Sequence, residues 1–394
     1  MFDHIIGPER SVTWVLQFWP ILAVSFAASL AATWLCKKIA IKFGIVDRPD
    51  DLVKTHKEPI AYLGGIGMLV GLTVGILLGI GFLVGCLQHE EFLRALKWLL
   101  GILAGATIAC SVGLADDLFD IKPSKKILGQ VVAAVALLSV GIVPNLRSTA
   151  DFFAWPLPGH LEAVLEILIV IVFVLGATNS LNLLDGLDGL CAGVTVIITV
   201  AMLLLSIHLA TWGFSGVGGD PVRLVVCLGL VGCVCGFLPF NRYPAKIFMG
   251  DAGSMLLGFM VAALMILFAE QTPRWWLASI VVFGLPILDT AVALARRLLN
   301  HRPLFVSDRG HIYDQMIDRG IPLKKTVAIC YVLASVYALI GLVMGLATRI
   351  NTWPYGVGVY VLVFMVSGLV VWKKGYLKME GLRGAIRSKD DTAT

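Results

Sequence analysis

The chain has 394 residues, of which 58% are hydrophobic and only 14% are charged, and its formal net charge at pH 7 is +5. This composition and the strongly positive mean hydropathy exclude a soluble globular domain and predict an all-α, polytopic membrane protein. The small net charge gives no indication of nucleic-acid binding. In a membrane protein, the distribution of Lys and Arg along the chain indicates which loops are cytoplasmic.

Apolar segments long enough to cross a bilayer, about 20 residues each, follow one another along most of the chain. They predict about 11 transmembrane helices. No fixed-period repeat or Gly/Ser-rich linker divides them, which predicts one membrane-embedded domain over residues 1–372 and a basic cytoplasmic tail over 373–394. The helices are expected at residues 13–36, 64–85, 97–115, 126–144, 162–181, 189–211, 222–240, 252–270, 275–296, 325–348 and 354–372.

Basic residues divide unequally between the two sides of the membrane that these segments imply. The loops after the first, third, fifth, seventh and ninth segments, with the C-terminal tail, hold 24 of the 31 Lys and Arg residues, and the other side holds 7. Because cytoplasmic loops are enriched in Lys and Arg, the side with 24 is expected to be cytoplasmic. The N-terminus is then outside and the C-terminus inside, in a cell inner membrane.

Aspartates gather on the same side, most of them at the ends of the apolar segments. Carboxylates that converge there from several loops would suit magnesium, which takes oxygen ligands and shares them with phosphates. For a single Asp at a helix start, an N-cap is the simpler interpretation. The sets that together favour a metal and phosphate site are Asp116–Asp117, Asn182 with Asp185 and Asp188, and Asp251.

The adjacent pair Asp116–Asp117 is costly at a membrane boundary, because two like charges raise each other's pKa unless a cation lies nearby. A bound cation is therefore expected. Lysines of the following loop could serve a metal-bound phosphate, although ordinary cytoplasmic flanking residues would give the same pattern. They are Lys122, Lys125 and Lys126.

Two further inner loops have the character of phosphate-binding segments. Residues 47–57 form a basic loop that runs into Gly64–Gly65, a flexible backbone expected to approach a phosphate closely. The longest inner loop is rich in arginine, which grips pyrophosphate by paired hydrogen bonds. Asp289, within the segment before this loop, is expected to pair with Arg296 or Arg297 on the same helix.

Taken together, the inner loops resemble those of the polyprenyl-phosphate N-acetylhexosamine-1-phosphate transferases, of the glycosyltransferase family 4 type. The resemblance covers about residues 44–320 and is strongest to the WecA-like branch, which is related to MraY. The matching strings are Asp47-Arg-Pro with His56 and Gly64-Gly65, Ala115-Asp116-Asp117, Asn179-Ser-Leu-Asn182-Leu-Leu-Asp185-Gly-Leu-Asp188-Gly-Leu, and Phe248-Met-Gly-Asp251-Ala-Gly-Ser254.

The resemblance implies the transfer of a sugar-1-phosphate from a UDP-sugar to undecaprenyl phosphate, with release of UMP and with Mg²⁺, or Mn²⁺ in its place, as cofactor. It implies Asp251 and Asn182 as metal ligands, and Asp116 as the candidate base with Asp117 beside it. His311 completes the expected catalytic residues. The residues expected to bind substrate are Asp188, at the uracil, Asp185, in the nucleoside pocket, and His56, Lys57, Lys125, Asn179, Arg302 and Arg309.

The fifth loop departs from the family pattern. It reads Asp308-Arg-Gly-His311-Ile-Tyr313-Asp314, where the WecA-like branch typically has His-x-His-His and MraY a run of three His and a Glu. The form is nearer the WecA-like one, so the resemblance favours a GlcNAc-type donor and the first step of an envelope polysaccharide such as lipopolysaccharide or teichoic acid.

The alternatives are a phospho-N-acetylmuramoyl-pentapeptide transferase of peptidoglycan synthesis and, from another class, a secondary transporter. A transporter would be expected to have a midplane site on broken helices and an internal repeat, neither of which the sequence indicates. The expected partners are the UDP-sugar, the polyprenyl phosphate, the bilayer and a second copy in a homodimer, with no nucleic acid.

Overall fold

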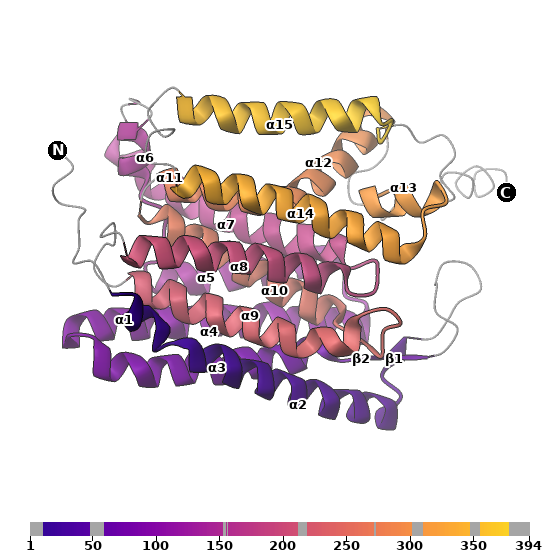
Figure 1. Cartoon of the computed structure of the whole chain (residues 1–394), viewed down its shortest axis with the longest axis horizontal. Coiled ribbons are helices and arrows are strands. Elements are labelled where there is room, and N and C mark those ends of the chain that lie inside the picture. Colours follow the sequence, from indigo (N-terminus) through magenta and orange to yellow (C-terminus); the bar gives the residue numbers. More distant parts are fainter. Residues whose placement is uncertain are drawn as a thin grey trace.

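The computed structural model describes residues 11–47, 59–152, 155, 157–211, 219–271, 273–301, 310–346 and 355–377. Long helices lie side by side in one bundle, and the described strands are three short ones at one end of it (Figure 1). The helices are α1 (Val12–Leu16), α2 (Trp19–Phe43), α3 (Gly64–Cys86), α4 (His89–Phe119), α5 (Pro123–Ser139), α6 (Leu146–Phe152), α7 (Gly159–Leu184), α8 (Leu190–Thr211), α9 (Gly219–Asn241), α10 (Gly250–Ala269), α11 (Pro273–Val282), α12 (Gly284–Leu299), α13 (Ile312–Asp318), α14 (Leu323–Leu346) and α15 (Tyr355–Lys373).

The chain is an all-helical, multi-pass membrane protein. Within the described residues, eight helices are long and apolar enough to cross a membrane, or nine if the bent pair α11–α12 is one span. Each segment predicted from the sequence contains helix, but α5, with 17 residues, is shorter than a usual span. The number of about 11 spans therefore stays a prediction.

One predicted segment, residues 275–296, is not the straight helix that the sequence led us to expect. It is divided into α11 and α12, which are bent by 67° at the break. Pro286 lies two residues into α12, and because proline has no N–H it cannot donate to the carbonyl of Val282, the last residue of α11. The single straight helix expected over residues 275–296 was therefore wrong.

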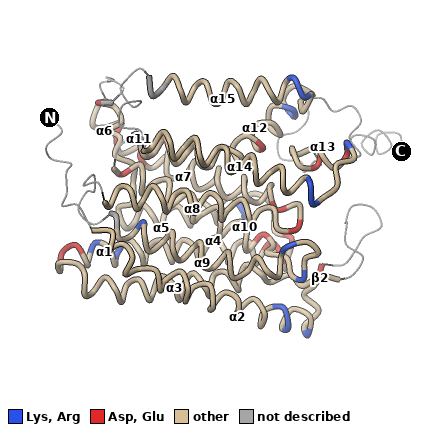
Figure 2. Tube along the Cα trace, in the orientation of Figure 1, with Lys and Arg blue, Asp and Glu red and all other residues tan. Residues whose placement is uncertain are grey.

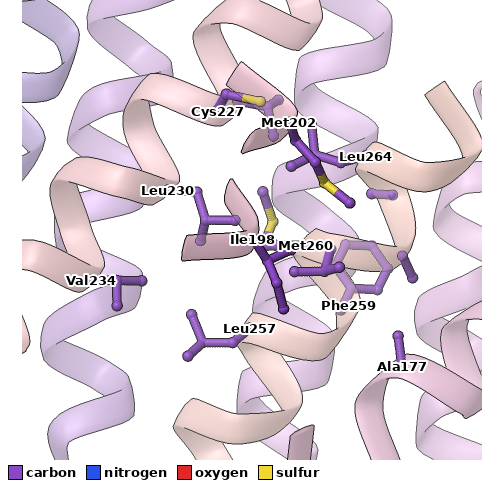
Figure 3. Close-up of a cluster of buried hydrophobic side chains, with 14 of the residues drawn as sticks. Ala177, Ile198, Met202, Cys227, Leu230, Val234, Leu257, Phe259, Met260 and Leu264 are labelled. Atoms are coloured by element: carbon purple, nitrogen blue, oxygen red, sulfur yellow. The ribbon is translucent and has the colours of Figure 1, made fainter. Parts of the chain in front are cut away.

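Helix α10 is the centre of the bundle. Every residue from Ala252 to Ala269 is buried, because α3, α4, α7, α8 and α9 surround it. A helix that is apolar on all sides is expected to be buried by its neighbours rather than to have one lipid-facing stripe. Figure 3 shows its residues Leu257, Phe259, Met260 and Leu264 packed among Ala177 of α7, Ile198 and Met202 of α8 and Cys227, Leu230 and Val234 of α9.

The loops predicted to be cytoplasmic lie together at one end of the bundle. There β1 (Val46–Asp47) pairs antiparallel with β2 (Ile60–Tyr62), and β2 pairs parallel with β3 (Ile247–Phe248), with Tyr62 opposite Phe248. This small sheet brings the end of the first loop to the start of α10 (Figure 1). Basic and acidic residues also gather at this end (Figure 2).

Candidate active site

The site is built where the last turn of α4 meets the first turn of α10. Gly113 of α4 lies so close to α10 that a side chain there would collide with the carbonyl oxygen of Asp251. This close approach, which small residues make possible in membrane helices, brings the end of α4 beside the start of α10. The end of α4 carries Asp116 and Asp117, so the carboxylates of two separate motifs come together.

Asp117 binds the N-terminus of α10 from a neighbouring helix. Its Oδ1 accepts a hydrogen bond from the backbone N–H of Asp251 (2.8 Å), and its Oδ2 accepts one from that of Ala252 (3.0 Å). Gly250 has a φ of +68°, and a side chain there would collide with the Asp117 carboxylate. The first N–H groups of a helix have no partner within it, and they carry the positive end of its dipole. Asp117 therefore satisfies two of them and fixes the start of α10.

Asp116 is held differently, by a lysine. Lys126 of α5 donates from Nζ to Asp116 Oδ2 (3.0 Å) and also to Asp251 Oδ2. The other carboxylate oxygen of Asp251 accepts a hydrogen bond from Asn182 Nδ2 (2.7 Å), which also donates to Ser254 Oγ (3.0 Å). Asp116, Lys126, Asp251 and Asn182, which come from four helices, thus form one connected group.

Lys126 is the lysine that contacts these carboxylates, whereas its neighbour Lys125 was the one selected for substrate binding. Lys125 is exposed, and it lines a groove of about 310 Å³ between α4 and α5 together with apolar residues such as Val112. Lys126 lies on the face of α5 that also buries Gln130 and Ala133, at spacings of four and seven residues. Helical periodicity across α5 could therefore have selected Lys126. The expected role of Lys125 stays a prediction.

The loop after α7 is fixed by neighbouring segments. Asp188 accepts a hydrogen bond from the backbone N–H of Ala245 (2.9 Å), and the N–H of Gly189 donates to Asn241 Oδ1 (3.1 Å). Asn179 lies one turn deeper than Asn182 and donates to Gln130 Oε1 on α5 (3.0 Å). The structure therefore places Asn179 in the contact between α5 and α7, and its expected role in binding substrate stays a prediction.

The site carries an excess of negative charge. Burial and the neighbouring carboxylates Asp251, Asp117 and Asp188 raise the pKa of Asp185 well above its ordinary value. Tyr62, which the sequence analysis did not select, lies against Gly250. Burial and several of the same carboxylates raise the pKa of its hydroxyl group, so Tyr62 stays a neutral hydrogen-bond donor. Such a site favours the binding of a cation.

His311 lies just before α13 and is buried. Its Nδ1 lies 2.7 Å from Asp289 Oδ2, and Asp289 Oδ1 accepts a hydrogen bond from the backbone N–H of Ile312 (2.7 Å). The prediction that Asp289 pairs with an arginine of its own helix was therefore wrong, because its described partners lie at the start of α13. The sequence did not indicate this contact, because it joins residues 22 positions apart.

Four expected substrate-binding residues lie outside the described residues: His56, Lys57, Arg302 and Arg309. The interpretation of Gly64–Gly65 as a flexible phosphate-binding backbone was wrong. Both glycines begin α3 and are buried, and the N–H of Gly65 donates to the carbonyl of Met249 (3.1 Å). They allow α3 to pack against the start of α10.

The donor set fits a hard divalent cation. Asp116, Asp251 and Asn182 offer carboxylate and amide oxygens, and the ammonium of Lys126 lies between the two carboxylates, where positive charge is needed. Within the described ranges, no three His, Cys, Asp or Glu side chains are preformed as a complete metal cage. A magnesium ion bound here would take its remaining ligands from water and substrate phosphates, as this ion commonly does.

Comparison with known proteins agrees with this geometry. The family model described as "Glycosyl transferase family 4" matches residues 99–269. The chain is 30% identical to a probable undecaprenyl-phosphate N-acetylglucosaminyl 1-phosphate transferase of Bacillus subtilis, over 95% of this chain and 94% of that protein. It is 29% identical to a decaprenyl-phosphate N-acetylglucosaminephosphotransferase of Mycolicibacterium smegmatis, over 80% and 79% of the two chains. It is also 29% identical to an undecaprenyl-phosphate alpha-N-acetylglucosaminyl 1-phosphate transferase of Yersinia pestis, over 88% and 89%.

Proposed function

Because the chain belongs to glycosyl transferase family 4, we propose that it transfers N-acetylglucosamine-1-phosphate from UDP-N-acetylglucosamine to a polyprenyl phosphate and releases UMP. The observation that carries this proposal is the convergence of Asp116, Asp117, Asn182 and Asp251 at one end of the bundle. The relatives reported above are named as N-acetylglucosaminyl 1-phosphate transferases or an N-acetylglucosaminephosphotransferase of undecaprenyl or decaprenyl phosphate, which supports the sugar and the lipid acceptor, and the UDP carrier is what the family implies.

In the reaction, an oxygen of the lipid phosphate attacks the phosphorus that carries the sugar. The bond from this phosphorus to the oxygen bridging it to UMP breaks, and UMP leaves with that oxygen. Because both reactants are anions, catalysis must come mainly from positioning and from neutralising charge. The residues proposed for this are Lys126 and the metal-binding pair Asp251 and Asn182, with Asp116 as the base that aligns or deprotonates the lipid phosphate.

Magnesium is the proposed cofactor, with manganese able to replace it. A bound divalent cation would neutralise the phosphates and help to orient them. Asp251 and Asn182 would hold the cation. Lys126 would compete with the cation for Asp116 and Asp251, or its ammonium group would move onto a substrate phosphate when the cation binds. Asp117 would take no part in binding the ion, since both its oxygens hold the start of α10.

The proposed location is the bacterial inner membrane with the site at the cytoplasmic face. Support comes from the unequal division of the basic residues along the sequence, 24 to 7, and from the described Lys and Arg residues that gather at the end of the bundle containing the site (Figure 2). The product would start an envelope polysaccharide. The homodimer also stays a prediction, which the mass of the purified protein in detergent tests.

The function is tested by following radiolabel from UDP-N-acetylglucosamine into lipid, with purified protein, undecaprenyl phosphate and Mg²⁺ in detergent. A panel of other UDP-sugars, including UDP-N-acetylmuramoyl-pentapeptide, serves as the specificity control. We expect transfer from UDP-N-acetylglucosamine, with UMP released in equal amount. A preference for the pentapeptide donor would establish the peptidoglycan alternative, and no transfer from any donor would overturn the proposed function.

A further inference from the structure

The contact between Asp289 and His311 joins the broken span to the fifth loop. Asp289 is 1% exposed and His311 is 5% exposed, so their 2.7 Å contact is shielded from water. A carboxylate buried in a helix of a membrane protein is costly unless it has close partners, and Asp289 has two, the His311 ring and the backbone N–H of Ile312. A hydrogen bond of this kind, between a charged and a polar group, is among the stronger ones in proteins.

This contact decides which nitrogen of the His311 ring carries a hydrogen. An ionised carboxylate only accepts hydrogen bonds, and Asp289 Oδ1 already accepts one from Ile312. His311 Nδ1 must therefore donate to Asp289 Oδ2. The second nitrogen, Nε2, is then directed away from Asp289, and the carboxylate stabilises positive charge on the ring whenever Nε2 takes a proton.

One face of the ring lies against Tyr313, which contacts the end of α7 and the loop after it. His311 stacks on Tyr313, with ring centroids 5.7 Å apart and an interplanar angle of 12°. The hydroxyl of Tyr313 donates to the carbonyl of Leu183 (2.9 Å), and its ring packs against Gly186. Leu183 and Gly186 flank Asp185, so Tyr313 joins His311 to the expected nucleoside pocket. Tyr313 is one of the two residues that replace histidines of the family pattern.

Helix α12 holds this segment at a second point. Arg296, two turns after Asp289, donates to the carbonyl of Gly310, and Gln315 donates to the same oxygen (2.9 Å). The backbone around His311 is thus fixed by several residues, but among the described contacts the ring is oriented by Asp289 and Tyr313.

We propose that Asp289 is a positioning residue that orients His311 and sets its hydrogen-bonding state for phosphotransfer, an inference that rests on the proposed function. The competing explanation is that Asp289 only anchors the start of α13 through Ile312. The substitution Asp289→Asn separates the two explanations. The asparagine Oδ1 can still accept from Ile312, but its NH₂ group then faces His311 Nδ1 and forces the hydrogen onto Nε2.

The experiment measures kcat, KM and the Tm of the wild type and of purified variants in the radiolabel assay. For Asp289→Asn we expect kcat to fall by about tenfold or more, with KM within about twofold and Tm nearly unchanged. In a His311→Gln background, the same substitution should cause no further loss of kcat, because residues that act as a unit are not additive. The inference would be overturned by a wild-type kcat in the Asp289→Asn variant. It would also be overturned if Asp289→Asn lowered kcat further in the His311→Gln background.

Two further variants keep the test decisive even if Asp289→Asn folds poorly. His311→Asn places an amide donor where Nδ1 was and so keeps the bond to Asp289, but it has no group at the position of Nε2. We expect a wild-type Tm with kcat as low as in His311→Ala, and wild-type kcat would overturn the inference. Gln315→Met, the matched control, loosens Gly310 without contacting the His311 ring, and it should lower Tm while kcat stays near that of the wild type.

If Gln315→Met lowers kcat as much as Asp289→Asn does, loosening of the segment explains both losses and the inference fails. Failure of the proposed function gives a different result. If the wild type transfers label from no UDP-sugar, the function fails and the inference fails with it, whereas an active wild type with an equally active Asp289→Asn variant removes the inference alone.

Discussion

The carboxylate of Asp117 accepts a hydrogen bond from the backbone N–H of Asp251 at 2.8 Å, so one acidic motif fixes the helix start that carries the other. Its neighbour Asp116 is paired with Lys126 instead. The two adjacent aspartates therefore have different tasks. Asp117 acts on the position of α10, and Asp116 remains directed toward the group of charges where substrate and metal are expected.

This difference predicts that Asp117→Asn destabilises the protein. An asparagine offers one acceptor where the carboxylate offers two, so one N–H at the start of α10 loses its partner, at a cost of about 1 kcal/mol. We expect Tm to fall by a few degrees and turnover to fall by a factor that hardly changes between pH 6.5 and 9. Thermal unfolding in detergent measures the first effect, and Asp116→Asn, with a nearly unchanged Tm, is the control. An unchanged Tm in Asp117→Asn would contradict the capping role.

The sequence predicted the parts of the site that depend on local strings. Asp116–Asp117, Asn182 and Asp251 were selected from motifs at helix ends, and the structure brings them together. Lys125 was selected for substrate binding in place of Lys126 because the choice needs the buried face of α5, and adjacent lysines differ only in which face of the helix they occupy. Asp289 was assigned to arginines of its own helix because its partner His311 lies 22 residues further along the chain.

For the fold, hydropathy located the long helices, since crossing lipid demands a long apolar run, but not the short helices α6 and α13. It did not show the bend at Pro286, because proline inside a membrane helix is often tolerated without a break. It also could not show that α10 is the central helix, since α8 and α14 are at least as apolar as α10. The contact of Gly64–Gly65 with the start of α10 was not predicted because the partner of Gly65, the carbonyl of Met249, is remote in sequence.

Lys126 and a divalent cation should compete for the same carboxylates. Removing the ammonium in Lys126→Met should therefore lower the Mg²⁺ concentration that gives half-maximal thermal stabilisation, by about tenfold, while turnover falls because a phosphate partner is lost. Lys125→Met, an exposed neighbour, is the matched control and should leave the midpoint unchanged. Asp251→Asn should fold but lose Mg²⁺-dependent turnover. If Lys126→Met instead needed a higher Mg²⁺ concentration for half-maximal stabilisation, the lysine would support binding of the ion rather than compete with it.

The raised pKa of Asp185 makes the metal-free protein less stable at higher pH. The folded state keeps this carboxyl protonated to a higher pH than the unfolded chain does, so its stabilising effect is complete below about pH 4 and is lost as pH rises through the raised pKa. In EDTA, Asp185→Asn should therefore lose less Tm between pH 5 and 8 than the wild type, by about 2 °C or more. Asp151→Asn, on α6 at the other end of the bundle, is the control (Figure 1). If the Tm of Asp185→Asn fell between pH 5 and 8 as much as that of the wild type, the fall would not be due to ionisation of Asp185.

The proposed orientation predicts which exposed positions an impermeant thiol reagent reaches in intact cells. Ser124→Cys lies at the start of α5, at the end of the bundle that contains the site, and should be protected. Arg147→Cys, on α6 at the opposite end, should react. Native thiols are controlled for in the parent protein, since Cys86 and Cys235 are partly exposed. The reverse labelling would place the site outside the cell and overturn the cytoplasmic assignment.

The role proposed for Asp116 as a base predicts a pH-dependent loss in Asp116→Asn. The second pKa of a phosphate monoester is about 6, so about a quarter of the lipid phosphate is still monoanionic at pH 6.5, whereas at pH 9 it is almost entirely dianionic and needs no base. General-base catalysis contributes at most about a hundred- to ten-thousandfold. That part of the loss should shrink as pH rises, whereas the part due to breaking the ion pair with Lys126 should persist.

Turnover of Asp116→Asn relative to the wild type is therefore expected to be lower at pH 6.5 than at pH 9, measured with saturating Mg²⁺ and both substrates. Asp117→Asn is the matched control on the adjacent residue, because its loss arises from the position of α10 and does not depend on the protonation of the lipid phosphate. If the deficit of Asp116→Asn is the same at both ends of the pH range, Asp116 positions the metal or the phosphate and abstracts no proton.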